Sequence, residues 1–267
     1  MPIPIYQVDA FASRPFTGNP AAVCLLDASD DAAWMQAVAA ETNLSETAFC
    51  QAAAPAETTR YSLRWFTPLA EVDLCGHATL AAAHVLWEIG QVRKADPIQF
   101  ATRSGILTCR RMKNQVDMDF PASSLTPCDA TEELIEAIGA EATECRRTDH
   151  DILLQLRDEA AVRGLRPDFQ ALRLVPARGI IVTARSSDEA YDFVSRFFAP
   201  SVGIDEDPVT GSAHCALAPY WAQKLGKNTL GGYQCSPRGG AVNVRLEGDR
   251  VTVSGNAITV MTGSITV

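Results

Sequence analysis

The 267-residue sequence lacks any run of about 18 uncharged apolar residues, which is the length that a membrane-spanning helix needs. It also lacks a block of lysine and arginine, and its formal net charge is −9 at pH 7. Nucleic acid is not an expected partner, because neutralising phosphates requires a basic surface. These absences predict a protein that neither spans a membrane nor binds nucleic acid.

Three sequence signatures are also missing. Eight cysteines occur at irregular spacings without a Cys-x-x-Cys pair, and most lie in apolar runs, so we expect buried free thiols and no disulfides. The first residues contain neither the basic segment nor the apolar stretch of a signal peptide, which predicts a cytoplasmic location. The segment Val209-Thr-Gly-Ser lacks the lysine and the glycine spacing of a nucleotide-binding P-loop.

The length exceeds the usual size of a single core, and 47% apolar and 21% charged residues are ordinary for a globular protein. We therefore expect two domains. Residues 1–122 form the predicted N-terminal lobe, which the extreme C-terminal strand, about 258–267, is expected to join. Residues 123–257 form the predicted C-terminal lobe.

What the sequence does contain is one motif that occurs twice. Residues 73–80 and 205–214 are polar, glycine-containing segments, and each leads directly into an almost wholly apolar helix. Arg64-Trp-Phe-Thr-Pro68 precedes the first segment, and Arg196-Phe-Phe-Ala-Pro200 precedes the second. The shared order indicates an internal duplication with a period of about 130 residues. The alternative is a chance similarity between two alanine-rich helices.

The hydrophobic pattern predicts an α+β protein with pseudo-two-fold symmetry. The helix predicted at 77–89 is apolar on every face, so strands of its own half are expected to bury it all round. The glycine-rich stretch near residues 231–240 is expected to form loops. The other predicted helices are 31–40, 131–138, 169–172 and 212–225, and the predicted strands include 47–51, 61–66, 98–101, 105–109, 116–120, 151–156, 179–184, 241–246, 250–254 and 257–261.

A glycine at the start of a helix allows a ligand to approach the backbone closely. Gly76 and Gly211 occupy this position in the two motifs. The first N–H groups of a helix have no partner within the helix and have a partial positive charge. The two helix starts therefore predict a site for a carboxylate or an enolate, and the alternative is that both are ordinary capped structural helices.

Titratable residues occur near both helix starts. Cys75 and His77 flank Gly76, while Asp207 and Ser212 flank Gly211. Glu46 lies in Asn43-Leu-Ser-Glu-Thr47 between a predicted helix and a predicted strand, where a carboxylate is often directed into a cleft. A carboxylate base with a second group that returns the proton is the arrangement that proton transfer at carbon requires.

Five sequence motifs together resemble the phenazine biosynthesis PhzF family. They are Thr17-Gly-Asn-Pro-Ala-Ala-Val23 with Asp9-Ala-Phe before it, Asn43-Leu-Ser-Glu-Thr-Ala-Phe49, Arg64-Trp-Phe-Thr-Pro68, Cys75-Gly-His-Ala-Thr79 and Asp207-Pro-Val-Thr-Gly-Ser-Ala-His214. They span both halves in the order of the family. The resemblance implies a diaminopimelate epimerase-like fold, with two lobes that are each a barrel-like sheet wrapped around a central buried helix, and with one active site between them.

The resemblance also implies a function. The reaction would be a cofactor-independent isomerisation of a small anionic substrate, by proton abstraction from carbon and reprotonation, without a metal. A homodimer is implied as well. The implied catalytic residues are Glu46 as the base with His77, Asp207 and Ser212, and the implied substrate-binding residues are Asn19, Gly76, Cys75, Thr210 and Gly211.

Three alternatives remain. An epimerase or racemase of this fold uses two cysteine thiolates, but Thr210 stands where the partner of Cys75 would be, and its hydroxyl is too weakly acidic. A binding protein that has lost turnover is a second possibility, since a fold does not guarantee chemistry. A metal site formed by Cys75, His77, His214 and Cys215 is disfavoured, because the last two are adjacent on a helix and point in different directions.

Overall fold

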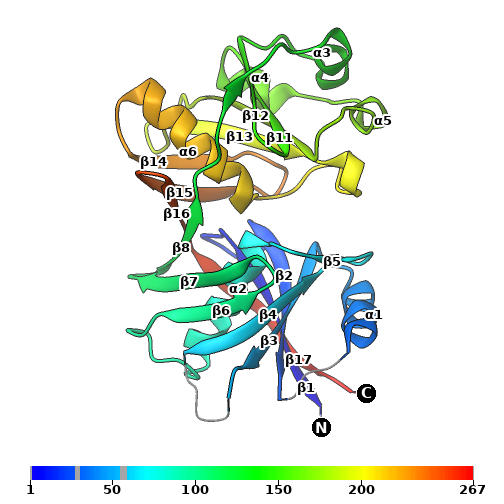
Figure 1. Cartoon of the computed structure of the whole chain (residues 1–267), viewed down its shortest axis with the longest axis vertical. Coiled ribbons are helices and arrows are strands. Elements are labelled where there is room, and N and C mark those ends of the chain that lie inside the picture. The colour runs from blue at the N-terminus through cyan, green and yellow to red at the C-terminus, as the bar shows by residue number, and fades with distance from the viewer. Residues whose placement is uncertain (1, 28–30, 55–58, 267) are drawn as a thin grey trace. The chain divides into compact units, whose positions relative to one another are not determined.

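The structure is a computed structural model that describes residues 2–27, 31–54 and 59–266. The chain divides into two compact units, residues 1–120 with 252–267 and residues 121–251 (Figure 1). The lobes predicted from the sequence are 1–122 with about 258–267, and 123–257. That these lobes are domains stays a prediction, and residues 1 and 267 at their ends lie outside the described residues.

The first unit is built on one mixed sheet. Two of its neighbouring pairs are parallel, Asn19–Leu26 with Glu46–Ala52 and Arg60–Phe66 with Ile98–Thr102, and the other pairs are antiparallel. Along the sheet the order is β17 (Ala257–Ile265), β1 (Ile3–Ala10), β2 (Asn19–Leu26), β3 (Glu46–Ala52), β4 (Arg60–Phe66), β6 (Ile98–Thr102), β7 (Gly105–Met112) and β8 (Gln115–Pro121), with the short β5 (Glu71–Val72) beside β4.

Helix α2 (Gly76–Glu88) is the central helix of the first unit and packs against β1, β2 and β3 (Figure 1). Ten of its 13 residues are buried, which confirms the burial on all sides that its sequence predicts. Helix α1 (Ala32–Thr42) packs on β3 and β4 through Met35 and Val38, which join Phe49 and Phe66 in a separate core cluster. The sheet of this unit therefore lies between two helices.

The second unit has its own central helix, α6 (Gly211–Leu225), which packs against β14 (Thr229–Gln234) and β15 (Gly240–Glu247). Helices α3 (Glu132–Ile138), α4 (Glu159–Gly164) and α5 (Phe169–Leu172) contribute to a separate apolar cluster, and η1 (Pro200–Val202) is a short 3-10 helix. Among the residues that the structure describes, no helix is both long and apolar enough to cross a membrane.

The strands of the second unit follow one another in sequence order. They are β9 (Thr126–Pro127), β10 (Glu144–Arg147), β11 (Asp151–Gln155), β12 (Gly179–Arg185), β13 (Phe193–Phe198), β14 (Thr229–Gln234) and β15 (Gly240–Glu247). Strand β16 (Arg250–Gly255) spans the boundary between the units.

Both units follow one connectivity. From β1 to β7 the successive pairings are antiparallel, parallel, antiparallel, parallel and antiparallel. From β10 to β15 the same five senses recur in the same order. In both units the central helix follows the fourth of these strands, counted without the short β5. The internal duplication that the sequence predicts is therefore confirmed.

A two-point arginine–glutamate pair occupies the corresponding place in each unit, just before the central helix. Arg64 in β4 donates to Glu71 through Nε at 2.7 Å and Nη2 at 2.8 Å. Arg196 in β13 donates to Glu206 through the same two nitrogens at the same distances. A two-point contact of this kind fixes the segment that leads into the central helix relative to the strand before it. The repeated sequence thus repeats a tertiary interaction as well as a helix.

The prediction of loops near residues 231–240 is wrong in part, because β14 extends through Gln234. Gly232 in this strand serves packing instead of a turn. A Cβ atom on Gly232 would lie 2.5 Å from the ring of Phe193, the residue paired with it on β13. Glycine in a strand interior marks such a close approach, so composition alone predicted the wrong element. Strand β10 and helix α4 were not predicted.

Glu159 at the start of α4 is a buried carboxylate whose contribution to the stability of the second unit can be measured by mutation. Its carboxylate accepts hydrogen bonds from Ser186 Oγ, Ser187 N and Ser187 Oγ at 2.7–3.2 Å and from Arg163 Nε at 2.7 Å. Burial opposes its charge, but these donors outweigh burial and lower the pKa of Glu159 to about 2. We expect Glu159→Gln to lower the free energy of unfolding at neutral pH by about 2 kcal/mol.

The lowered pKa of Glu159 predicts in which direction its contribution to stability changes with pH. Because the folded pKa of Glu159 is depressed, its stabilisation is complete above its ordinary pKa of 4.5 and is lost as the pH falls towards about 2. Urea unfolding of wild type and variant between pH 7 and pH 2 measures the difference, with Glu141→Gln as an exposed control. A difference that stayed constant over this range would contradict the assignment.

Candidate active site

Three elements of the first unit begin close together. The second residue after the start of β2, Ala21, pairs in parallel with Glu46 at the start of β3, and α2 packs on both strands. Asn43 ends α1 in the left-handed conformation, with φ of 50°, and so redirects the chain towards β3. The first residues of these elements are Asn19, Glu46 and Gly76, so the fold brings the predicted site residues of the first unit close together.

His77 is the centre of this cluster. Its Nε2 lies 3.0 Å from Glu46 Oε2, and its Nδ1 lies 3.1 Å from the side-chain nitrogen of Asn19. Ser45 Oγ donates to Asn19 Oδ1 at 3.2 Å, which orients the amide so that its NH₂ group faces His77. In the neutral ring Nδ1 then accepts from Asn19, and the ring proton is on Nε2, the nitrogen nearest to Glu46. Ser45 was not predicted as a site residue.

Cys75 completes the cluster from the other side of the imidazole. Its Sγ lies 3.6 Å from His77 Nδ1 and 4.0 Å from Nε2. Glu46, Cys75 and His77 are each 9% exposed or less. Burial raises the pKa of the Cys75 thiol, and the nearby Glu46 charge raises it further, so at neutral pH the group is a thiol.

The pKa of His77 shifts in the opposite sense from what burial alone would cause. Burial lowers it, because a desolvated imidazolium is unfavourable, but the contacts with Cys75 and with the Glu46 carboxylate outweigh burial. The net result is a pKa of His77 well above its ordinary value of 6.5. The ring can therefore hold a proton next to the Glu46 carboxylate.

One oxygen of the Glu46 carboxylate is available for chemistry. Oε2 is at ion-pair distance from His77 Nε2 but outside hydrogen-bond geometry, and it has no hydrogen-bond partner among the described residues. A buried polar atom of this kind calls for an explanation in a native structure. A lone pair that no donor occupies is what a base for a carbon acid needs.

Both central helices begin in the same way. Cys75 and Thr210 are the N-cap residues, and in neither case does the structure, within the residues it describes, give the side chain a capping hydrogen bond. Gly76 and Gly211 are the first helical residues. The first-turn N–H groups of each helix are therefore not used by the cap side chain, as an anion-binding role would require.

In the second unit, the turn before α6 is held by Gln234, a residue that the sequence pattern did not predict. Gln234 in β14 accepts from Thr210 N at 2.8 Å and donates to Asp207 O at 2.8 Å and to Thr210 Oγ1 at 3.2 Å. Thr210 Oγ1 in turn donates to Asp207 Oδ2 at 2.5 Å. All three residues are at least nine-tenths buried. A buried glutamine at the end of a strand is the signal that could have identified it.

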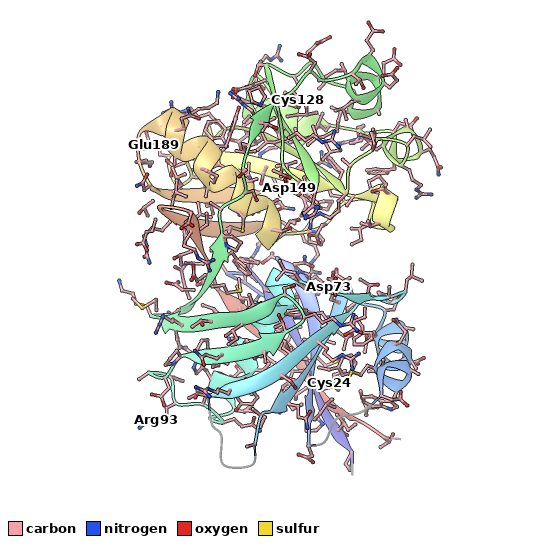
Figure 2. All side chains as sticks on the ribbon, viewed as in Figure 1. Cys24, Asp73, Arg93, Cys128, Asp149 and Glu189 are labelled. Atoms are coloured by element: carbon pink, nitrogen blue, oxygen red, sulfur yellow. The ribbon has the colours of Figure 1, made fainter. Side chains whose placement is uncertain are left out.

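Ser212, which follows Gly211 in α6, is half-buried. Ser212 Oγ accepts from Arg178 Nη2 at 3.3 Å, and Arg178 also forms a two-point ion pair with the buried Asp151. Asp73, which is labelled in Figure 2, precedes the first helix start and is exposed. Its carboxylate lies 3.6 Å from Arg103 Nη1.

The metal-binding set considered from sequence is not the set that the structure brings together. Oxygen, sulfur and nitrogen atoms of Glu46, Cys75 and His77 lie within 4.8 Å of one another, and these atom types suit zinc. His214 instead is fully buried in α6, where its Nδ1 lies 2.8 Å from Thr210 O. Burial lowers the pKa of His214 to about 4, so its ring is neutral.

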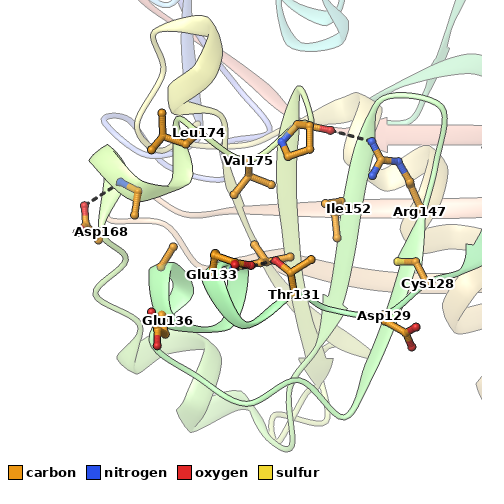
Figure 3. A pocket seen from close by; sticks show the side chains of 14 residues that line it. Cys128, Asp129, Thr131, Glu133, Glu136, Arg147, Ile152, Asp168, Leu174 and Val175 are labelled. Atoms are coloured by element: carbon orange, nitrogen blue, oxygen red, sulfur yellow. Dashed lines mark hydrogen bonds between the residues drawn. The ribbon is translucent and has the colours of Figure 1, made fainter.

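A separate hollow of about 640 Å³ lies in the second unit, between α3, α5 and β10–β11 (Figure 3). Arg147 Nη2 donates to Pro176 O at 2.7 Å beside it. Its wall is apolar with an acidic rim, and it contains none of the predicted site residues. The residues lining it are Cys128, Asp129, Thr131, Glu133, Leu134, Glu136, Ala137, Arg147, Ile152, Asp168, Ala171, Leu174, Val175 and Pro176.

Comparison with known proteins agrees with the resemblance seen in the sequence. Residues 8–263 match the family described as phenazine biosynthesis-like protein. A protein of Halalkalibacterium halodurans named an uncharacterized isomerase is 49% identical over 98% of this chain and 97% of its own length. The crystal structure of a PhzF family protein from Enterococcus faecalis superimposes with a TM-score of 0.94 at 41% identity and covers all of both chains. A probable proline racemase from Agrobacterium radiobacter shares the fold at 12% identity, with a TM-score of 0.67 over 99% of this chain and 93% of its own.

Proposed function

The chain belongs to the phenazine biosynthesis-like protein family, and from that premise we propose that it is a cofactor-independent isomerase of a small anionic metabolite. Relatives about half identical to it are named isomerases, which supports this class of reaction. In the proposed reaction Glu46 removes a proton from a carbon atom of the substrate. The proton then returns at another position.

The observation that carries the proposal is the environment of the Glu46 carboxylate. Its Oε2 is buried and lacks a hydrogen-bond donor among the described residues, while His77 lies 3.0 Å away. A carboxylate in that environment can accept a proton from carbon, and an adjacent imidazole can exchange protons with it. Asn19 and Ser45 act as positioning residues, because they hold the ring of His77 with Nε2 towards the base.

Negative charge that develops on the substrate needs fixed donors. We assign this role to the first-turn N–H groups at Gly76 and at Gly211, whose partial positive charge favours anions. Asp207 and Ser212 are proposed to bind the substrate or relay its proton, and Cys75 and Thr210 to contact it. The buried Asp207–Thr210–Gln234 group supports a fixed geometry for this part of the second unit. The homodimer and the cytoplasmic location stay predictions.

Racemisation through Cys75 is the less favoured chemistry. The thiolate is the reactive form of cysteine, and burial raises the pKa of Cys75. The corresponding residue of the duplicated motif is Thr210, which cannot act as the second thiol. A reaction through one carboxylate therefore fits the cluster better than a two-thiol reaction.

Proton exchange with solvent tests the proposal directly. The enzyme is incubated in deuterated water with a panel of small unsaturated, hydroxy-substituted and amino-substituted carboxylic acids, and the acids are analysed by mass spectrometry. We expect deuterium to enter the carbon skeleton of at least one acid, together with a shift of its double bond. Deuterium incorporation at one stereocentre without a bond shift would instead indicate an epimerase.

A catalytically inactive binding protein predicts a different pattern. Metabolites would raise its melting temperature by mass action, but no acid in the panel would gain deuterium. That pattern would contradict the isomerase proposal and would support a metabolite-binding protein of the same fold.

Zinc is expected to inhibit the reaction. Because Glu46, Cys75 and His77 offer the oxygen, sulfur and nitrogen ligands that zinc prefers, a bound ion would occupy the lone pair of the proposed base. We expect micromolar zinc to suppress deuterium incorporation and a chelator to restore it. Magnesium is the control, because it prefers oxygen ligands in an octahedral arrangement. Equal inhibition by both ions would contradict binding at this cluster.

A further inference from the structure

Cys128, the first residue after β9, lies opposite Cys145 in the neighbouring strand β10. Pro127 pairs with Arg146 at the end of β9, and one residue farther on Cys128 N donates to Cys145 O at 3.2 Å. The two Sγ atoms are 2.7 Å apart. We propose that Cys128 and Cys145 form a reversible disulfide when the protein meets a peroxide, so that this pair is an oxidation site separate from the Glu46 cluster.

Access and approach distinguish this pair from the other thiols. Cys128 is half-buried, while the other seven cysteines are buried. Cys128 and Cys145 both line a surface hollow of about 520 Å³, so a small oxidant can reach them. Among the described residues no other two cysteine sulfurs are in such contact. The expectation of free thiols thus holds for the reduced protein, and this pair is where oxidation would change it.

The proposed chemistry is balanced with hydrogen peroxide as the oxidant. The Cys128 thiol attacks one peroxide oxygen, the O–O bond breaks, and a sulfenic acid and one water form. The Cys145 thiol then attacks the Cys128 sulfur, the S–O bond breaks, the S–S bond forms, and a second water leaves. Two thiols are oxidised, and one peroxide is reduced to two water molecules.

Burial has a consequence for the rate of this reaction. Desolvation, and then the neighbouring Cys128, raise the pKa of the Cys145 thiol to about 12. Since Cys145 remains a thiol at neutral pH, the second step should be slow at pH 7 and faster at higher pH. The rate of disulfide formation should therefore rise with pH.

The cross-link would close a defined segment of the chain. Helix α3 lies between the two cysteines, and its residues Glu133, Leu134, Glu136 and Ala137 form one wall of the larger hollow in Figure 3. A covalent link at the base of this segment restricts the unfolded chain. The oxidised protein should therefore unfold at a higher temperature, and the amides of residues 128–145 should exchange hydrogen more slowly.

The sequence allows the link to be mapped with two proteases. No lysine or arginine lies between residues 114 and 145, so trypsin releases both cysteines in one peptide, residues 114–146. A protease specific for glutamate then cuts at five sites between them, Glu132, Glu133, Glu136, Glu141 and Glu144. After peroxide treatment and alkylation in denaturant, we expect the two cysteine fragments to stay joined until a reductant is added. The intact protein should have lost two of its eight alkylatable thiols.

Cys128→Ser and Cys145→Ser test the pairing. Each variant should keep its remaining thiol alkylatable or gain a single oxygen, and neither should show the temperature shift on oxidation. Three outcomes would overturn the proposal: all eight thiols still alkylatable in wild type, a link that includes another cysteine, or a link between two chains. Because the readouts are mass and stability, a failure here would leave the isomerase proposal unaffected.

Discussion

Replacing Glu46 with glutamine should lower the rate of deuterium incorporation roughly 10³-fold, which is within the usual range for loss of a catalytic base. Glutamine keeps the size and shape of the side chain but offers no basic oxygen to a carbon-bound proton. The reason to expect so large an effect is that Oε2 is the buried lone pair beside His77. Exchange of substrate protons, measured by mass spectrometry in deuterated water, is the readout.

Two further variants make this result interpretable. Glu46→Asp keeps a carboxylate on a shorter side chain and should retain more exchange than Glu46→Gln. Glu41→Gln removes an exposed carboxylate from α1 and should behave as wild type. All three should fold, which thermal unfolding can check. Undiminished exchange in Glu46→Gln, with the fold intact, would exclude Glu46 as the base.

Replacing Gly18 with alanine should destabilise the protein by about 3 kcal/mol or more. Gly18 has φ of +69°, and a Cβ atom there would lie 2.1 Å from the main-chain oxygen of Ala10. A backbone oxygen in a strand cannot move aside as a flexible side chain can. The residue after Gly18 is Asn19, which positions His77, so the variant should also lose catalytic rate.

Gly90 provides the matched control for this substitution. It has φ of +76°, but a Cβ atom there would meet nothing within 4 Å. Gly90→Ala should therefore cost only the left-handed backbone conformation, about 1 kcal/mol. The difference between the two variants in urea unfolding isolates the steric clash. Equal losses would mean that the backbone conformation alone, and not the contact with Ala10, decides the cost.

Much of the fold could be predicted from local pattern. The apolar faces of residues 77–89 can only be satisfied by burial, and α2 is buried accordingly. The repeated segments gave the duplication, since each includes an arginine before the turn and a glycine at the helix start. Strand β14 could not be predicted, because the reason for Gly232 is the ring of Phe193, a residue more than thirty positions away.

The candidate site was predictable in its members but not in its contacts. Glu46, Cys75 and His77 were singled out by their position next to predicted helix and strand ends. That Asn19 orients the ring of His77, and that Ser45 orients Asn19, depends on the parallel register of β2 and β3. Gln234 was missed for the same reason, since its partners come from a turn more than twenty residues earlier in the chain.

The first unit is built from two separate stretches of the chain, so its strands are not synthesised one after another. Strand β17 pairs along all of β1, from Ile3 with Ile265 to Ala10 with Ala257, yet it is synthesised after every other strand that the structure describes. Until it emerges, one edge of β1 has unpaired N–H and C=O groups, while every residue of the second unit has already been translated. The ribosome therefore completes the second unit before it completes the first unit. A truncation that removes only β17 leaves the unit that contains Glu46 with an open sheet edge.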